Sequence, residues 1–206
     1  TMKHPKLNAL ALGTALALAS TGHALAESQY GFAATGSGTV TATAKVNLSV
    51  VIPKLILLKV GTTNATQDTV SWAASLTIPG TPTTTPTATA NNVQVPWDGT
   101  APTVTTTPTG NVLNVAAWTN AGSATINCAM GTWSATGGPA STSFTVTAGG
   151  TTPLPHPGAN LGSCASTTIS TNTLMSGTWT YALTGTASSW TAGTYTNAVT
   201  YTATGI

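Results

Sequence analysis

The side chains that could do acid–base chemistry are few, and they lie far apart along the chain. Beyond residue 26 they are Glu27, Asp68, Asp98 and His156, and no two of them are close in sequence. General acid–base catalysis needs titratable groups that are held together in one site. The chain also has no serine-nucleophile elbow, no regular spacing of metal ligands and no phosphate-binding loop. We therefore expect a protein that is not an enzyme and that holds no metal and no cofactor.

Two cysteines, Cys128 and Cys164, could form a disulfide or bind a metal. A metal site would need further ligands, but beyond residue 26 the only histidine is His156. It stands among the prolines of residues 153–157, which is typical of a solvated loop residue. In an exported protein a single pair of cysteines most simply forms one disulfide. We expect this bond, which would stabilise the fold by about 3–4 kcal/mol in the chain-entropy model.

The first 26 residues have the pattern of a secretory signal peptide. Lys3 and Lys6 give a positive start, residues 7–19 are apolar, and Ala24-Leu25-Ala26 is a small-x-small cleavage site. The apolar stretch is shorter than the roughly 20 residues that span a bilayer as a helix. We therefore expect export with cleavage after residue 26 and no membrane span in the mature chain, rather than a retained membrane anchor.

Charge argues against nucleic acid as a partner. Cleavage would leave three lysines against three carboxylates, and the chain has no arginine. Arginine supplies the bidentate contacts by which proteins hold phosphates and base edges. We therefore exclude nucleic-acid binding.

The composition predicts an all-β fold. Threonine occurs 47 times, and charged residues make up 4% of the chain. Threonine suits the pleated surface of a sheet, and almost no segment beyond residue 26 has helical periodicity. We expect an antiparallel β-sandwich of about eight to ten short strands. Charged residues at strand edges usually prevent edge-to-edge pairing between sheets, and this chain has few of them. We therefore expect a partner or threonine-linked glycans to cover the edges.

The clearest pattern is a strict alternation of apolar and polar residues over residues 40–52. Its apolar members are Val40, Ala42, Ala44, Val46, Leu48, Val50 and Ile52. This period of two is typical of a strand with one buried face. After Pro53, residues 55–58 are apolar on both faces, which is typical of a central strand of a sandwich.

Residues 79–110 form a Thr/Pro-rich insertion in which the pentapeptide TTTPT occurs twice, at 83–87 and 105–109. Such a segment is either a carrier of O-glycans or an ordinary long loop. Within it we expect an edge strand at 93–97, because Pro96 cannot donate a hydrogen bond to a ladder. Other strands are expected at 69–78, 111–118, 124–128, 143–147, 178–183 and 194–204.

Two segments resemble subunits of chaperone–usher pili, closest to the archaic, spore-coat-protein-U-like branch. Residues 38–46, GTVTATAKV, are similar to the Gly-Thr-Val entry of many fimbrial subunits. Residues 192–203, AGTYTNAVTYTA, are similar to the final strand of the archaic pilins. The chain departs from the family by lacking a cysteine at the end of the N-terminal strand and an aromatic residue near position 206.

The resemblance implies an immunoglobulin-like sandwich that lacks one strand and so exposes core in a groove. A periplasmic chaperone fills the groove first, and the N-terminal extension of the next subunit then replaces it at an outer-membrane usher. The product is an extracellular head-to-tail homopolymer. It implies a donor-strand extension at 27–44 and a sandwich at 45–206. The inserting side chains would be Tyr30, Phe32, Ala34, Val40, Ala42 and Ala44, and Gly36 and Gly38 would permit close approach of the backbone.

Two alternatives stay open. Residues 39–52 could instead be the first strand of a complete sandwich. The chain could also be a stand-alone surface adhesin or glycan-binding module, since tryptophan rings stack on sugars. Trp97 and Trp133 are the candidates for exposure because they lie in turn-rich stretches.

Overall fold

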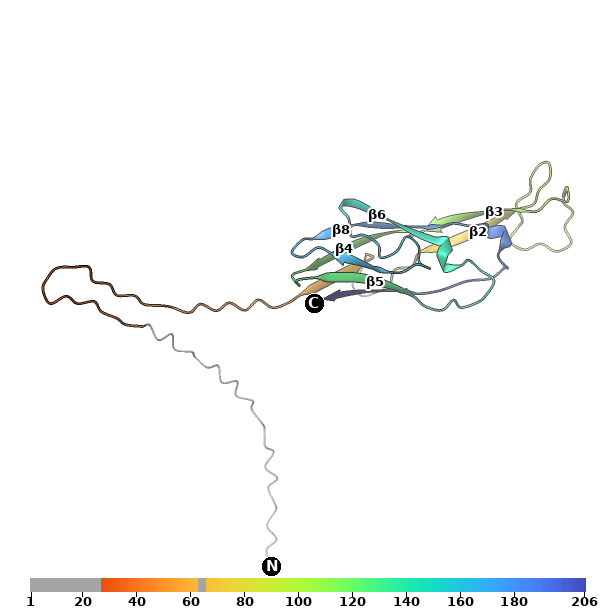
Figure 1. Ribbon diagram of the computed structural model, residues 1–206. Coiled ribbons are helices and arrows are strands. Elements are labelled where there is room, and N and C mark those ends of the chain that lie inside the picture. The colour runs from red at the N-terminus through yellow and green to blue at the C-terminus, as the bar shows by residue number, and fades with distance from the viewer. Residues whose placement is uncertain (1–26, 63–65) are drawn as a thin grey trace, which may run out of the picture. The chain divides into compact units, whose positions relative to one another are not determined.

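The computed structural model describes residues 27–62 and 66–206 (Figure 1). The predicted signal peptide lies outside these residues. The chain divides into two units, Thr1–Ile52 and Pro53–Ile206. The assignment of residues 27–44 as a donor-strand extension stays a prediction. We call the described part of the first unit, residues 27–52, the extension, and the second unit the sandwich unit.

The regular secondary structure of the sandwich unit is almost entirely antiparallel strand, so the predicted all-β sandwich is confirmed. The first sheet has the order β1-β4-β8-β6 and consists of β1 (Ile56–Val60), β4 (Val112–Thr119), β8 (Met175–Leu183) and β6 (Phe144–Thr152). The second has the order β7-β5-β9 and consists of β7 (Ser166–Ile169), β5 (Ala124–Met130) and β9 (Val199–Gly205). A separate pair joins β2 (Ser71–Thr77) to β3 (Thr103–Thr109). Two single 3₁₀ turns are η1 (Ser141–Ser143) and η2 (Ala187–Ser189).

The core lies between the first and second sheets because their alternating side chains face each other. Val115 and Ala117 of β4 are buried, as is Ile126 of β5. Trp179 of β8 is fully buried, and its indole N–H donates a hydrogen bond to the Leu154 carbonyl at 2.7 Å. A buried tryptophan thus has its polar atom satisfied, as core packing requires.

The predicted disulfide between Cys128 and Cys164 is confirmed, with 5.3 Å between the two Cα atoms. Cys128 lies on β5, and the bond ties this strand to the segment that follows β6. That segment also buries Leu154 and Pro157 against the core. The disulfide therefore holds a proline-rich loop onto the sandwich.

Several strand predictions differ from the structure. Residues 56–58, expected to lie in a central strand, belong to β1, which is an edge strand because it pairs only with β4. Leu57 is 54% exposed, so β1 is not buried on both faces. Residues 93–97 form no strand. Residues 103–109, expected as part of a loop, form β3 because β2 supplies a partner. Within the described residues, the structure contains no helix long and apolar enough to cross a membrane.

Candidate functional site

The extension contains no strand, although it carries the strictest alternation in the sequence. The apolar members of that alternation are exposed, with Leu48 at 90% and Val50 at 84%. The residues predicted to insert into a neighbour are also exposed, and the structure brings none of them into a packed site: Tyr30, Phe32, Ala34, Gly36, Val40, Ala42 and Ala44. Their role as a donor strand stays a prediction. The extension is an apolar surface without a sheet to pack on.

The first half of the extension folds back on the second. The Gly36 N–H donates a hydrogen bond to the Ala33 carbonyl at 3.3 Å, which closes a turn. Beyond the turn, Gly31 lies so close to Thr41 that a Cβ at position 31 would stand 3.0 Å from the Thr41 nitrogen. Only a residue without a side chain fits such an approach. Within the alternation, residues 42–52 have no such close approach to the first half of the extension.

In the sandwich unit, β1 and β9 are the two edge strands that leave the core incompletely covered. Each pairs on one side only, β1 with β4 and β9 with β5. The inward-facing side chains of both are only partly buried, whereas those of β4 and β5 are buried almost completely. Among the described residues, no strand pairs with the outer edge of β9.

This free edge continues before β9. The Ala198 carbonyl accepts a hydrogen bond from the Gly131 N–H at 2.8 Å, and the Thr196 carbonyl accepts one from the Ser134 N–H at 3.0 Å. Both bonds extend the pairing with β5 in irregular form. One edge of residues 196–205 is therefore bonded to the β5 side, and the other edge faces away from it.

β1 and β9 converge at one end, which we call the narrow end. The Thr119 hydroxyl donates a hydrogen bond to the Leu55 carbonyl at 2.9 Å, just before β1. The same hydroxyl lies 3.6 Å from the position that a Cβ on Gly205 would occupy, at the end of β9. Thr119 is completely buried at this junction. The register of the ladders makes β1 and β9 antiparallel, with β1 leaving the narrow end and β9 approaching it.

Away from the narrow end lies an open groove of about 1310 Å³, to which β1 contributes Val60 and β9 contributes Val199 and Tyr201, while much of its lining comes from β2–β3 and from residues 187–198. Core residues such as Leu113 and Tyr181 form part of its lining. The groove then continues between β2–β3 and residues 190–198, reaching Leu76. We call this the wide end.

Aromatic side chains line much of the groove. The Trp72 ring packs edge-on against Phe144 with centroids 5.2 Å apart, and Trp133 packs against the same ring at 5.5 Å. The Trp133 indole N–H also donates a hydrogen bond to the Ser141 hydroxyl at 3.3 Å. The prediction that Trp133 is exposed is therefore wrong, because it is a partly buried wall of the groove. The matching prediction for Trp97 is confirmed, since 58% of it is exposed.

A directed chain of hydrogen bonds connects the groove to the loop held by the disulfide. The His156 Nδ1 is 2.6 Å from the Gly158 carbonyl, which can only accept, so Nδ1 carries the proton. In the neutral ring Nε2 must then accept from the Tyr201 hydroxyl, at 2.9 Å. The Tyr201 oxygen in turn accepts from the Tyr181 hydroxyl at 2.8 Å. Both tyrosines line the groove.

The prediction of a solvated His156 is wrong, because the ring is half-buried and packs edge-on against Trp179 at 4.8 Å. Burial lowers the pKa of His156, although the bond to Gly158 opposes the shift. Burial likewise raises the pKa of Tyr181 and of Tyr201. All three groups are therefore neutral near pH 7, and the two tyrosines form a fixed polar strip in the lining of the groove.

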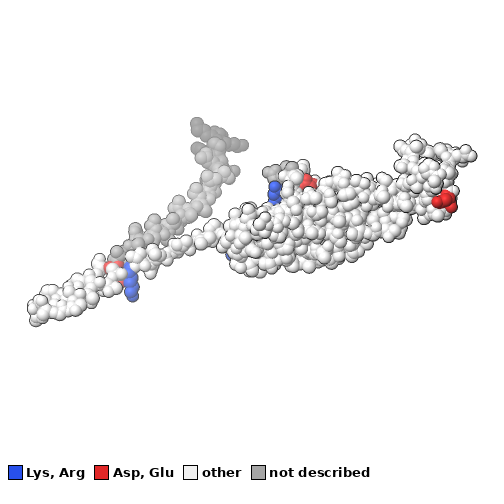
Figure 2. Space-filling view, turned by 90° about the horizontal axis from the view of Figure 1, so that it is seen from above, with Lys and Arg blue, Asp and Glu red and all other residues white. Residues whose placement is uncertain are grey.

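Charge is sparse on the sandwich unit, and Figure 2 shows most of the visible surface without it. Asp98 lies in the loop between β2 and β3, where hydrogen bonds from the Thr100 side chain and backbone lower its pKa. Within residues 27–62 and 66–206, no three His, Cys, Asp or Glu side chains form a group that could hold a metal ion.

Comparison with protein-family models, with curated proteins and with solved structures found no match to this chain. The site is therefore defined by geometry alone: an exposed alternating extension in one unit and an unfilled apolar groove in the other.

Proposed function

We propose that this chain is the structural subunit of an extracellular bacterial filament, in which the extension of one copy fills the groove of the next. One observation carries the proposal. The same chain has an exposed alternating segment without a sheet and an apolar groove beside a free strand edge. Strand addition would bury the apolar face of the segment and pair the free edge. Backbone hydrogen bonds would give affinity, and alternate side chains would fill the groove.

The strand order supports an immunoglobulin-like sandwich that lacks its last strand. Such sandwiches have strands A, B, E and D in one sheet and C, F and G in the other. With β2, β3 and β7 left out, the strands β1, β4, β5, β6, β8 and β9 become A to F in chain order. The first sheet then has the order A-B-E-D, and C and F are neighbours in the second. The position of G, beside β9, has no strand among the described residues.

Length and side-chain size support residues 40–52 as the inserting strand, antiparallel to β9. The free edge covers residues 196–205, so residues 40–52 are long enough to pair along all of it. In the antiparallel direction, Ala42 and Ala44 would lie toward the narrow end. Leu48 and Ile52 would lie toward the wide end, where Trp72 and Leu76 leave more room. The parallel direction would press the largest side chains into the narrowest part.

Hydrogen bonds at Asn120 oppose insertion into the chain's own groove. The Asn120 side chain donates to the Pro53 carbonyl at 2.8 Å and accepts from the Leu55 N–H at 2.7 Å. A return into the same groove would need a tight reversal between Ile52 and Ile56, at the residues that these bonds hold extended. Insertion into another copy needs no such reversal.

The proposal implies two further partners and a location. An unfilled apolar groove would aggregate in the periplasm, so a chaperone would have to cover it before assembly. An outer-membrane usher would then exchange the chaperone for the next extension. The assembled filament would lie on the cell surface.

The proposal is tested with a matched pair of charge substitutions. Leu48→Asp places a carboxylate on the inserting face, where burial without a partner is costly. Asn47→Asp places the same charge on the opposite face of the same strand. We expect purified chain to form polymers that resist SDS on unheated gels and appear as fibres by negative-stain microscopy. Asn47→Asp should retain them and Leu48→Asp should lose them.

Two results would overturn the proposal: fibres from Leu48→Asp at the wild-type level, or cell-surface shearings in which mass spectrometry finds the chain but microscopy finds no filament.

The aromatic lining of the groove favours a second candidate function, a glycan-binding module, because indole rings stack on sugars. That candidate predicts quenching of tryptophan fluorescence by an oligosaccharide and none by a peptide of residues 40–52.

A further inference from the structure

The loop at residues 78–102, between β2 and β3, presents apolar surface that nothing in the sandwich unit covers. Val93 is 68% exposed, and Trp97 is exposed although its indole N–H donates a hydrogen bond to the Thr100 carbonyl at 2.7 Å. Asp98 accepts two hydrogen bonds from Thr100 in the same turn. The turn thus fixes the polar atom of Trp97 internally and leaves the ring face outward. Exposed, preorganised tryptophans of this kind are typical anchors of protein interfaces.

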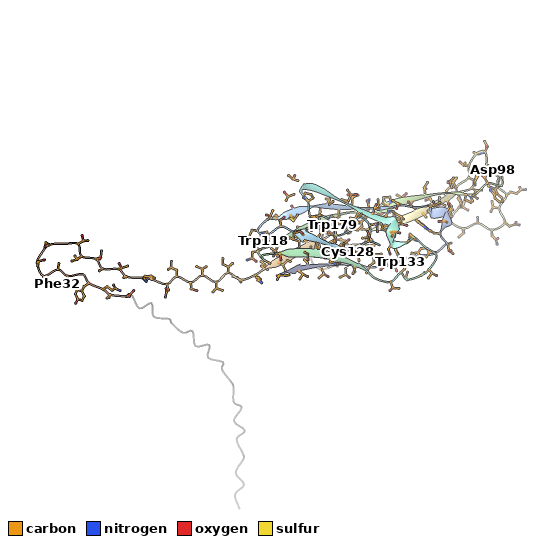
Figure 3. All side chains as sticks on the ribbon, in the orientation of Figure 1. Phe32, Asp98, Trp118, Cys128, Trp133 and Trp179 are labelled. Atoms are coloured by element: carbon orange, nitrogen blue, oxygen red, sulfur yellow. A yellow bond between two sulfur atoms is a disulfide. The ribbon has the colours of Figure 1, made fainter. Side chains whose placement is uncertain are left out.

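This loop stands at the wide end of the groove. Ala101, Pro102 and Val104 line the groove where β3 begins, and Leu76 lines it where β2 ends. Figure 3 shows Asp98 at the end of the sandwich unit opposite to Trp118, which precedes Thr119 at the narrow end. A strand that leaves the groove at its wide end therefore passes beside residues 78–102.

The next step rests on the proposed function. With residues 40–52 of a donating copy antiparallel to β9, Ile52 lies at the wide end. The sandwich unit of that copy begins at Pro53, and β1 begins at Ile56. Three extended residues span only about 10 Å. The donating sandwich must therefore lie directly against the loop of the accepting copy.

We propose that residues 78–102 form a second interface between consecutive copies, in which the loop docks on the sandwich of the copy whose strand it receives. Trp97 supplies the apolar contact. Asp98 faces Lys54, which is exposed and lies two residues beyond the inserting segment. Charge supports this choice of partner, because Asp98 is the only charged residue between positions 69 and 206. The donating copy thus brings a cation to the one anion of the loop, whereas Asp68, which lines the groove, already accepts hydrogen bonds from the Thr62 backbone N–H and hydroxyl.

Cysteine cross-linking in assembled polymers tests the proposal. The double variant Lys54→Cys, Asp98→Cys should give a ladder of covalent oligomers on denaturing, non-reducing gels after mild oxidation, and reduction should remove it. Each single variant should give no ladder. The matched control is Lys54→Cys with Thr152→Cys, an exposed position on β6 at the other edge of the first sheet, and it should also give none.

Hydrogen exchange provides a second measurement that needs no new cysteine. The backbone amides of residues 93–100 should exchange at least tenfold more slowly in wild-type polymers than in the monomeric Leu48→Asp variant. Polymers that give neither a ladder nor this protection would overturn the second interface and leave the proposed function intact. Wild-type protein that never polymerises would overturn both.

Discussion

Two segments of this chain alternate apolar and polar residues with a period of two, but only one of them forms a strand. Residues 199–205 form β9, with Val199, Tyr201 and Ala203 turned toward the core. Residues 40–52 form no strand and expose the whole apolar set. Alternation predicts that a segment can cover a sheet; it does not say in which molecule the sheet lies. The two segments should also differ in four measurable properties.

The largest difference is expected from the same charge placed in each segment. Tyr201→Asp buries a carboxylate and breaks the bonds to His156 and Tyr181, so it should lower the free energy of unfolding by about 3–5 kcal/mol. Val50→Asp should change the stability of the monomer by less than about 0.5 kcal/mol, since the residue contacts no core. Thermal unfolding of both monomers measures the difference. Equal losses would mean that the extension belongs to its own fold.

The disulfide should stabilise the sandwich unit, which contains β9, and should not affect the extension. Replacing both Cys128 and Cys164 by alanine should cost about 3–4 kcal/mol, because the bond restricts the unfolded chain. The rate at which a protease cleaves residues 27–52 should stay unchanged, since the disulfide lies in the other unit. Denaturant titration and limited proteolysis give the two numbers. A slower or faster cut in the extension would show coupling between the units.

The third prediction joins the two segments in trans. A peptide of residues 40–52 should bind the Val50→Asp protein, which keeps its groove but lacks an intact inserting strand. At a hundred times its dissociation constant the peptide should stabilise the protein by about 2.7 kcal/mol. The same peptide with Leu48→Asp should give no shift in the melting temperature. A shift with both peptides would point to nonspecific binding.

The smallest effect concerns pH. Because burial lowers the pKa of His156 in the folded state, the unfolded state binds more protons as the pH falls below about 6.5. Stability should therefore be complete above that pH and decrease below it, and His156→Gln should remove this slope. The stability of a variant without His156 is the matched reference for this slope, since residues 27–52 contain no histidine. A slope that persists in His156→Gln would assign it to another group.

Most strands that pair within the sandwich unit can be predicted from the sequence, although neither β3 nor β7 is predicted from it. The alternation of residues 111–118 predicted β4, and the two cysteines predicted their bond. The pentapeptide TTTPT shows the limit: its copy at 105–109 lies in β3, and its copy at 83–87 forms no named strand. The sequence of both is identical, so only the presence of β2 opposite one of them decides the conformation.

The groove could not be predicted, because it depends on which strands are neighbours. Tyr181 and Tyr201 are far apart in sequence and meet only when β8 and β9 face each other across the core. His156 was assigned to solvent because of the prolines around it. Leu154 and Pro157, which lie on either side of it in the chain, are buried, so His156 is held against the core.

Asn120 gives the sandwich unit a mechanical property. In a filament under tension, force would enter each subunit at Pro53 and leave through the strand beside β9. Asn120 binds Pro53 and Leu55 directly, and it lies in the turn that leads from β4 into β5, the partner of β9. Pulling would therefore pass across this turn before it sheared the ladder between β1 and β4. The Asn120 side chain would therefore link the two points at which force acts on the subunit. Its loss should lower the force needed to separate β1 from β4.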